Sequence, residues 1–330
     1  CHDANIDAPE GFYEPADIRG ILTEVELPEV DKNSSITTPL LIRMRRPVTC
    51  KAYDMVMYQR APHLSERCTW SNYCGNRTRT TKTAPEIRDK ATFEEFAEQA
   101  ADRFDRLVPG IVEEDVEGWK ANQKPRNLKR YEKAREQYER APGKMRKYVF
   151  EKIEKLVGYS PKKARHHKPR IIQAVSPCVQ AMIGPWCYGL NKLMHKHLTP
   201  DKPISMACGR TSEEMGVMPT ACLQEGGKTK TCDFGKYDLS QGEAHLAVQR
   251  RMWLKKGMPD WMAQMLEDMA DCMGMTPYDF LVWVLMRCSG EPGTTCFNTA
   301  YNATMWDYTC WKTGITDYRV LVGGDDSLFW

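Results

Sequence analysis

The chain has 330 residues, of which 42% are hydrophobic and 28% charged, and its formal net charge at pH 7 is +3. These values are ordinary for a soluble globular protein and leave room for one large domain or two smaller ones. The longest dense apolar run, from Phe280 to Met286, is far too short to cross a bilayer. The 13 cysteines are an odd number, which argues against a secreted, disulfide-stapled scaffold and indicates the reduced thiols of a cytosolic protein.

Residues 1–85 are rich in Pro, Thr, Arg and Cys and lack sustained periodicity, which predicts short strands and loops. This segment holds one grouping of metal-ligand residue types, namely Cys50, His63, Cys68 and Cys74. The spacing matches no standard zinc pattern, since those contain closely spaced Cys pairs. Ordinary thiols are therefore the favoured interpretation, and a metal site is left open as the alternative.

The first helical pattern runs from Phe93 to about Val108, where apolar residues recur on one helical face. These residues are Phe93, Phe96, Ala97, Ala100 and Phe104. A polar, charged helix is predicted over residues 127–138, and Pro142-Gly143 breaks the pattern after it. A further helix is predicted over residues 145–156.

Beyond this point the chain mixes strands and helices. Strands are predicted over residues 170–175, 228–234, 318–322 and 328–330. Helices are predicted over residues 182–198, 243–254, 260–273, 278–287 and 294–309, and loops over 208–210 and 289–293. Ser240 is a fair N-cap for the helix that begins at Glu243. Helix-rich sequence followed by mixed strands and helices predicts an α+β fold.

Positive charge is concentrated in one block, from Lys120 to Arg170. This block has 18 Lys or Arg and 5 Asp or Glu, a net charge of +13, which leaves −10 for the rest of the chain. Such a block indicates contact with phosphate. For Lys129–Arg140 a solvated helix face is an equally good interpretation, because Glu residues recur there at helical spacing. The stretch from Lys162 to Arg170 has no acidic residue, so phosphate binding is favoured there.

Two groups of acidic residues suggest metal chemistry. Gly324-Asp325-Asp326 places adjacent carboxylates at a predicted strand-turn-strand tip, where a divalent cation would relieve their repulsion. Alone, this triplet is a weak signal, because a lone Gly-Asp-Asp is more often an ordinary hairpin turn. Asp233 ends a β-prone run and Asp238 follows five residues later, which alone suggests helix-capping carboxylates. Together, the two groups provide the strand-end carboxylates that a two-metal phosphoryl-transfer site needs.

Two further elements could contact a nucleotide. In Ser289-Gly290-Glu291-Pro292-Gly293-Thr294-Thr295-Cys296-Phe297-Asn298, a Gly-rich loop opens a helix. Thr294 and Asn298 then share one helical face and offer short polar groups to a ligand, although an ordinary capped helix with a solvent-facing Asn298 explains the same letters. Lys168-Pro169-Arg170 can bind phosphate, and Lys162, Lys163 and Arg165 precede it.

These elements occur in the order basic KPR, Asp-x4-Asp, SGxxxTxxxN and Gly-Asp-Asp. The set resembles motifs F, A, B and C of the RNA-dependent RNA polymerases of positive-strand RNA viruses, over roughly residues 150–330. The segment HKPRIIQAVSP is most similar to tombusvirus-like or noda-like enzymes. One departure is Gly235, where many members carry Ser or another polar residue, whereas Tyr237 retains the aromatic residue before the second Asp.

The resemblance implies a role for each motif. Asp233 and Asp325 would ligate two Mg²⁺ ions, for which Mn²⁺ could substitute, and Asp326 would support them. The ribose 2′-hydroxyl of the incoming nucleotide would be recognised by Asp238, Ser289, Thr294 and Asn298, beside a loop made mobile by Gly290 and Gly293. The triphosphate would be held by Lys168 and Arg170, and RNA phosphates more weakly by Lys162, Lys163 and Arg165.

The implied activity is template-directed transfer of ribonucleoside monophosphates to an RNA 3′-hydroxyl. RNA template, nascent strand and ribonucleoside triphosphates would be partners, with other viral replication proteins, in a membrane-associated complex of the host cytoplasm. The implied fold is a right hand, with fingers and fingertips over residues 1–225 and a palm with an antiparallel sheet over 226–330. The palm would include a finger-like helical insertion near 255–285.

The thumb and motifs D and E would lie beyond Trp330, because the chain stops shortly after the Gly-Asp-Asp triplet. The first residue, Cys1, also suggests a piece of a longer protein, and such a fragment could be inactive alone.

Two rival functions remain. A reverse transcriptase or DNA polymerase would also use palm carboxylates, but it would be expected to carry a bulky steric gate near residue 238. A non-catalytic RNA-binding protein would use the basic block and keep the acids for structure.

Overall fold

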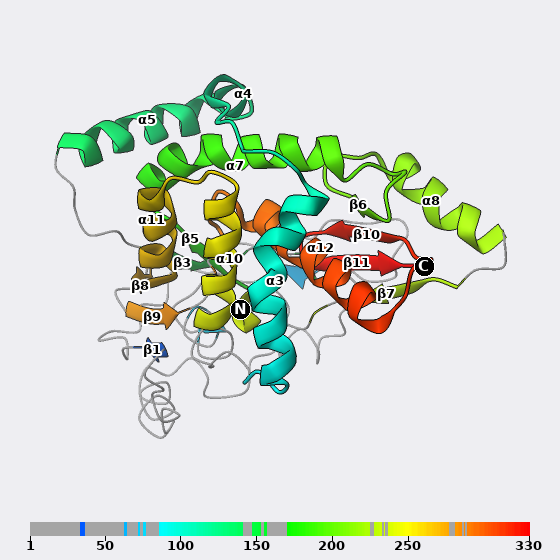
Figure 1. Ribbon diagram of the computed structural model, residues 1–330. Helices are drawn as coiled ribbons and strands as arrows, with labels where there is room; N and C mark the ends of the chain where they lie inside the picture. The colour runs from blue at the N-terminus through cyan, green and yellow to red at the C-terminus, as the bar shows by residue number, and fades with distance from the viewer. Residues whose placement is uncertain are drawn as a thin grey trace. The chain divides into compact units, whose positions relative to one another are not determined.

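The computed structural model describes residues 34–36, 63–64, 72, 75–76, 86–140, 147–152, 155–156, 170–224, 228–232, 234, 237–276, 281–285, 287 and 289–330. The chain forms two compact units, each assembled from separate stretches of sequence (Figure 1). The first unit comprises residues 1–83, 145–174 and 270–285, and the second comprises residues 84–144, 175–269 and 286–330.

The first unit contains a five-stranded sheet of order β1-β9-β8-β3-β5. Its strands are β1 (Ser34–Ile36), β3 (Lys147–Glu151), β5 (Ile171–Ala174), β8 (Asp271–Met275) and β9 (Leu281–Leu285). β3 pairs antiparallel with β5 and parallel with β8. A second, two-stranded sheet joins β2 (His63–Leu64) to β4 (Lys155–Leu156). The predicted strand over residues 170–175 is confirmed by β5.

Three helix predictions that overlap strands of this unit are wrong in whole or in part. Within the helices predicted over residues 145–156 and 278–287, the structure describes strands over 147–151, 155–156 and 281–285, and the helix predicted over 260–273 ends at Ala270, where β8 begins. The physical reason is tertiary pairing. Short apolar runs suit either state, and these runs find backbone partners in one another: Asp271–Met275 pairs with Leu281–Leu285. The buried Lys147 adds a contact, because its Nζ donates to the carbonyl of Ala270 at 2.6 Å.

The second unit contains a four-stranded sheet of order β6-β10-β11-β7. Its strands are β6 (Ile204–Met206), β7 (Lys230–Cys232), β10 (Val320–Gly323) and β11 (Asp326–Phe329). β10 and β11 pair antiparallel as a hairpin, β11 pairs antiparallel with β7, and β10 pairs parallel with β6. The predicted strands over residues 318–322 and 328–330 are therefore confirmed as a hairpin, and the one over 228–234 is confirmed as a shorter strand.

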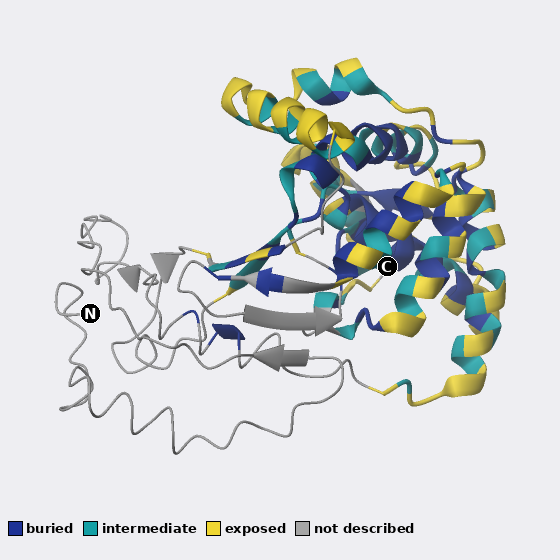
Figure 2. Ribbon diagram, turned by 90° about the vertical axis from the view of Figure 1, so that its left-hand side faces the viewer, coloured by how far each residue is buried: buried dark blue, intermediate teal, exposed yellow. Residues whose placement is uncertain are grey.

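The other regular elements described in this unit are helices. They are α3 (Lys90–Leu107), α4 (Val116–Ala121), α5 (Pro125–Arg140), α7 (Pro177–His197), α8 (Ser212–Gln224), α9 (Tyr237–Ser240), α10 (Glu243–Lys255), α11 (Asp260–Ala270) and α12 (Thr294–Thr313). α3 shows why they form: Asp89 accepts a hydrogen bond from the N–H of Thr92 at 3.0 Å, and Phe96, Ala100 and Phe104 bury one face. Figure 2 shows buried and exposed positions side by side along other helices of this unit, whereas α5 buries no residue.

One capping prediction is wrong. The N-cap of α10 is Gly242, whereas Ser240 ends the short helix α9 and its Oγ donates to the carbonyl of Tyr237 at 2.7 Å. The short helix α9 was not predicted. Ser240 is its last residue and therefore does not cap α10. The first residues of α9 are Tyr237 and Asp238, so it positions one of the candidate site carboxylates.

The hairpin and α12 share an apolar core. Val320 and Val322 of β10 pack with Ile204 of β6 and Ala303 of α12, and all four side chains are buried. The face of α12 that carries Ala303 is thereby held against the strand that leads into the Gly-Asp-Asp triplet. Among the helices that the structure describes, none is long and apolar enough to span a membrane.

Candidate active site

The β10–β11 hairpin presents the two adjacent carboxylates. Its last paired residues are Gly323 and Asp326, so Gly324 and Asp325 form the turn. Gly324 has a φ of +67°, in the left-handed region that favours glycine. The strand before the turn is buried, whereas Asp325 is partly exposed and Asp326 exposed. The predicted strand-turn-strand geometry is confirmed.

α12 packs its polar residues against this turn. Thr299 Oγ1 accepts a hydrogen bond from the N–H of Gly324 at 2.8 Å. One turn further along the helix, Asn302 Nδ2 lies 3.2 Å from the carbonyl oxygen of Gly324 and 3.3 Å from that of Asp325. Trp306 Nε1 donates to Ser327 Oγ at 3.1 Å. A single face of α12 therefore holds the hairpin at and just beyond its turn.

Asn298 of α12 pairs with Asp238 of α9. Asn298 Nδ2 donates to Asp238 Oδ1 at 3.0 Å, and Asn298 is 5% exposed. The alternative in which Asn298 faces solvent is thus wrong. Its Oδ1 is buried and accepts no hydrogen bond from any described residue. The pairing brings together two residues 60 positions apart in sequence that had been expected to act together.

The loop before α12 makes hydrogen bonds to α7 and within itself. The carbonyl of Gly290 accepts a hydrogen bond from Gln180 Nε2 of α7 at 2.9 Å. Thr294 Oγ1 donates to the carbonyl of Glu291 at 3.1 Å, while Ser289 is exposed. At Gly293 an added Cβ would lie 2.5 Å from the ring of Phe297, so a larger residue does not fit without a shift. The predicted loop and helix are confirmed, with the glycine explained by close packing.

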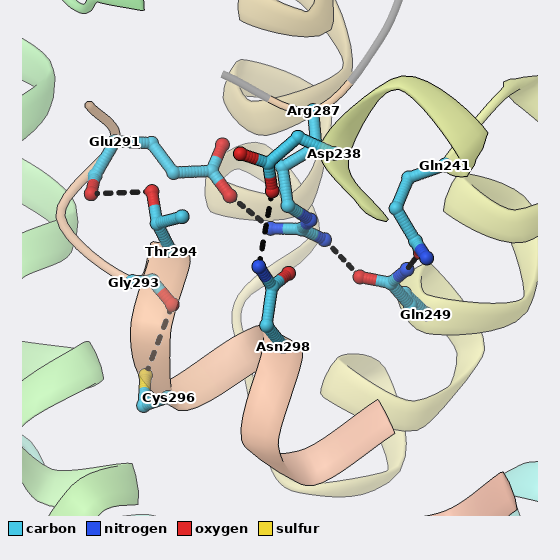
Figure 3. Close-up of polar contacts among 9 residues, drawn as sticks. All are labelled: Asp238, Gln241, Gln249, Arg287, Glu291, Gly293, Thr294, Cys296 and Asn298. Atoms are coloured by element: carbon cyan, nitrogen blue, oxygen red, sulfur yellow. Dashed lines mark hydrogen bonds and ion pairs between the residues drawn. The ribbon is translucent and has the colours of Figure 1, made fainter. Parts of the chain in front are cut away.

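Arg287 is a site residue that the sequence reasoning missed. Its guanidinium is buried, at 4% exposure, and contacts the carboxylate of Glu291 and the side-chain oxygen of Gln249 (Figure 3). Gln249 Nε2 in turn donates to Gln241 Oε1 at 2.5 Å. The chain of contacts ties the loop before α12 to α10 and to the end of α9. The sequence reasoning gave no signal for this pair, because Glu291 falls in the predicted loop over residues 289–293.

Tyr237 lies within electrostatic range of the same groups. Burial raises the pKa of its hydroxyl well above the ordinary value; Arg287 lowers the pKa, and the carboxylates of Asp325 and Asp238 raise it. The phenol therefore stays protonated at neutral pH. The charges of Asp325, Asp238 and Arg287 thus all act on one buried side chain.

Several predicted site residues lie elsewhere or outside the description. Asp233, Lys162, Lys163, Arg165 and Lys168 lie outside the described residues, as do the side chains of the group Cys50, His63, Cys68 and Cys74. Arg170 belongs to the first unit, where it is exposed and its carbonyl accepts from the N–H of Lys152 at 2.8 Å. The site described here is therefore built entirely from the second unit.

The donor atoms at the hairpin suit a hard cation. Asp325 and Asp326 offer carboxylate oxygens, the ligands that Mg²⁺ takes in proteins. In the part of the chain that the structure describes, no group of three or more His, Cys, Asp or Glu side chains could hold a metal ion. Asp233 lies outside the described residues and follows β7, which pairs with β11 in the sheet.

Comparison with known proteins assigns the family. A family model described as RNA dependent RNA polymerase matches residues 79–330. The match covers most of the chain, including every described residue of the site, and the chain belongs to this family.

One relative extends the comparison. The non-structural polyprotein pORF1 of avian hepatitis E virus (isolate Chicken/California/Meng) is 28% identical over 127 residues. These residues make up 38% of this chain and 8% of the polyprotein, so the chain matches only a small part of that protein's length.

Proposed function

We propose that this chain carries the nucleotide-transfer site of an RNA-directed RNA polymerase that replicates and transcribes a viral genome. The family membership supports the reaction class. The observation that carries the proposal is the double contact of α12. Asn298 binds Asp238, and one turn later Asn302 binds the turn that bears Asp325. One helix thereby joins the residues suited to read a ribose to the carboxylates suited to the chemistry.

In this proposal Asp238 and Asn298 read the ribose 2′-hydroxyl. A hydroxyl both donates and accepts, so it can be recognised by a carboxylate and an amide together. The buried Oδ1 of Asn298, unpaired among the described residues, supplies an acceptor next to the Asp238 carboxylate once the neighbouring loop moves. Ser289 and Thr294 lie at that loop and add hydroxyls, while Gly290 and Gly293 permit its movement.

Asp325 and Asp233, supported by Asp326, would hold two Mg²⁺ ions, with Mn²⁺ able to substitute. When bound, such ions supply Lewis-acid activation of the 3′-hydroxyl and neutralise charge on the phosphates. The contribution of the chain is orientation: the short hairpin turn fixes where the Asp325 carboxylate points. Lys168 and Arg170 would bind the triphosphate, and Lys162, Lys163 and Arg165 would contact RNA phosphates.

The remaining assignments complete the proposal. Residues 1–225 would form fingers and fingertips and residues 226–330 the palm of a right-hand fold, with the insertion near 255–285. RNA template, nascent strand, ribonucleotides and other viral replication proteins would be partners. The complex would work in the host cytoplasm at a membrane, and the tombusvirus-like or noda-like subgroup stays a prediction.

Primer extension tests the activity and the carboxylate together. The full-length protein that contains this chain should extend an RNA primer on an RNA template with Mg²⁺ and ribonucleotides. Asp325→Asn keeps the size of the side chain but removes its charge, and we expect activity to fall by about a hundredfold or more. Asp317→Asn is the matched control, because Asp317 is an exposed carboxylate shortly before β10.

Equal activity of wild type and Asp325→Asn would place the chemistry elsewhere. An inactive wild type that still binds RNA would favour the non-catalytic alternative instead. Extension with deoxynucleotides as efficient as with ribonucleotides would favour a DNA-synthesising enzyme.

Sugar discrimination tests the Asp238–Asn298 pair. Asn298→Ala removes the donor to Asp238 and the acceptor beside it, so we expect the preference for ribo- over deoxynucleotides to fall about tenfold or more. The readout is kcat/KM for both nucleotides. Thr309→Ala is the control, since the Thr309 hydroxyl donates only to the carbonyl of Met305 on the same helix. Unchanged discrimination in Asn298→Ala would remove this role.

A further inference from the structure

We infer that Thr299 and Asn302 of α12 are positioning residues that fix the Gly324-Asp325 turn and, through it, the Asp325 carboxylate. The inference rests on the proposed function, because the reactive role of Asp325 is proposed there. It concerns how the turn is held and not which groups touch the substrate.

The backbone of a hairpin turn ordinarily bonds to water, because its amides point away from the neighbouring strand. In this hairpin the turn is bonded to side chains of α12. The N–H of Gly324 and the carbonyls of Gly324, Asp325 and Asp326 all lie within 3.5 Å of polar atoms of Thr299 or Asn302. Polar groups on three consecutive residues are therefore held by one helix.

The hydrogen bond of Thr299 has a defined direction. Its hydroxyl donates its single hydrogen to the carbonyl of Thr295 at 2.8 Å, so its oxygen is left to accept from the N–H of Gly324 at 2.8 Å. Thr299 is fully buried, at 0% exposure. Removing the hydroxyl would leave a buried N–H without a partner, which is more costly than losing a bond at the surface.

The amide of Asn302 has only one workable orientation. Its Nδ2 faces carbonyl oxygens of Gly324, Asp325 and Asp326 at 3.2, 3.3 and 3.5 Å. A flipped amide would put its oxygen against these acceptors and repel them. Asn302 is also at 0% exposure, so water does not compete for its hydrogens. One side chain thus bridges the turn and resists its opening.

Apolar packing alone would not define this geometry. Ala303 packs α12 against Val320 and Val322, but hydrophobic contact is non-directional and leaves the turn free to rotate its peptide planes. Thr299 is also the residue after Asn298. A shift of α12 along its axis would therefore displace both the side chains that hold the Gly324-Asp325 turn and the Asn298 side chain that binds Asp238. The position of one helix thus sets the position of both groups.

The test compares four variants of the full-length protein. Thr299→Val keeps the shape and removes the hydroxyl, Thr299→Ser keeps the hydroxyl, and Asn302→Ala removes the bridging amide. Thr304→Val is the matched control: Thr304 is buried in the same helix, and its hydroxyl donates only to the carbonyl of Ala300 at 2.7 Å. The readouts are amide hydrogen exchange over residues 322–327, Mn²⁺ affinity by titration, and kcat and KM in primer extension.

We expect Thr299→Val and Asn302→Ala to speed exchange in the turn about tenfold or more, and to lower kcat by about ten- to a hundredfold. KM for the nucleotide should stay within about twofold, because the binding residues are intact. Mn²⁺ affinity should fall with kcat. Thr299→Ser should retain most of the wild-type behaviour, and Thr304→Val should match the wild type.

Unchanged exchange in both variants would overturn the inference, as would faster exchange without any loss of kcat or Mn²⁺ affinity. Equal losses in Thr304→Val would mean a general weakening of α12 and would also overturn it. An inactive wild type would refute the proposed function. The positioning role would then be judged by exchange and Mn²⁺ affinity alone, and no difference between Thr299→Val and Thr304→Val would refute it.

Discussion

The guanidinium of Arg287 is buried where the loop leading into α12 meets α10. Its partners are Glu291, which is itself buried, and Gln249, so the charge is compensated and hydrogen-bonded inside the second unit. The ring centroid of Phe297 lies 5.3 Å from the guanidinium carbon, which adds a cation–π contact. Removing both charged side chains of a buried ion pair should lower the free energy of unfolding less than removing one of them.

Arg287→Met should therefore lower the free energy of unfolding by roughly 3–5 kcal/mol, because it leaves the Glu291 carboxylate buried without its cation. Adding Glu291→Met should restore part of this loss. Urea denaturation of the single and double variants measures both effects. The control is Arg250→Met, whose ion-pair partners Asp260 and Glu267 are both accessible to solvent; it should cost about 1 kcal/mol or less. Equal losses at the two arginines would contradict the argument.

Single-residue roles were only partly readable from the sequence. Asp238 and Asn298 were expected to act together, and the structure places them in contact. Arg287, Thr299 and Asn302 were not singled out, because the meaning of each depends on a partner remote in sequence. The sequence alone does not say whether a given arginine is buried or exposed, because burial depends on tertiary packing.

At the level of elements, α3, α10 and α12 meet at His245. Its Nδ1 lies 2.8 Å from the hydroxyl of Tyr301 on α12, and its ring lies edge-on to Phe93 of α3, with ring centroids 4.8 Å apart. Burial lowers the pKa of His245 below its ordinary value, because a charged imidazole would be poorly solvated there. The folded state therefore favours the neutral imidazole of His245.

The burial of neutral His245 between α3, α10 and α12 predicts a pH dependence of stability. The unfolded chain takes up a proton near pH 6.5, while folded His245 takes it up only at lower pH. The stabilisation is therefore complete above about pH 6.5 and decreases as the pH falls below that value toward the folded-state pKa. Thermal melts at pH 7.5 and 5.5 should show a smaller drop in Tm for His245→Gln than for wild type.

The control for this pH prediction is His197→Gln. Burial also lowers the pKa of His197, but this side chain lies closer to solvent, so its variant should change the pH dependence less. Identical pH profiles for wild type and His245→Gln would show that His245 is not the source of the lower stability at acidic pH.

Elements were predicted well where the signal is local. α3, α12 and the β10–β11 hairpin were predicted from helical periodicity, from a Gly-rich loop that opens a helix, and from a glycine turn. The segments 147–151 and 281–285 were predicted as helices and are strands. Their apolar runs are short enough for either state, and the choice was made by pairing with strands elsewhere in the chain.

At the scale of the whole molecule, charge is distributed unevenly. Part of the basic block forms α5, which buries no residue and packs along α7 by one face. Lys129 and Arg130 are exposed and make no ion pair with any described residue, whereas Arg135 pairs with Glu139 at 2.8 Å. The first turn of α5 also lacks an acidic residue. An exposed, unpaired basic face suits an RNA backbone.

Neutralising Lys129 and Arg130 together as Lys129→Gln/Arg130→Gln should weaken RNA binding at low salt. The slope of log affinity against log salt concentration should shrink by about 1–2 units, because up to two phosphate contacts are lost. Filter binding over a salt series measures this. Arg135→Gln/Glu139→Gln is the control, as it removes a matched pair without changing net charge. Equal slopes in all proteins would leave α5 as a solvated helix face, the alternative open from the sequence.

The sequence by itself determined the α+β class, the local helices, the hairpin turn and the order of motifs that indicated the polymerase family. These features depend on neighbouring residues: a helix bonds within four positions, and a glycine turn needs its own residues only. The tertiary structure decided which apolar runs became strands, which arginine was buried and that α12 holds both Asp238 and the Gly324-Asp325 turn. Those outcomes depend on pairing and burial between distant segments, which no local pattern records.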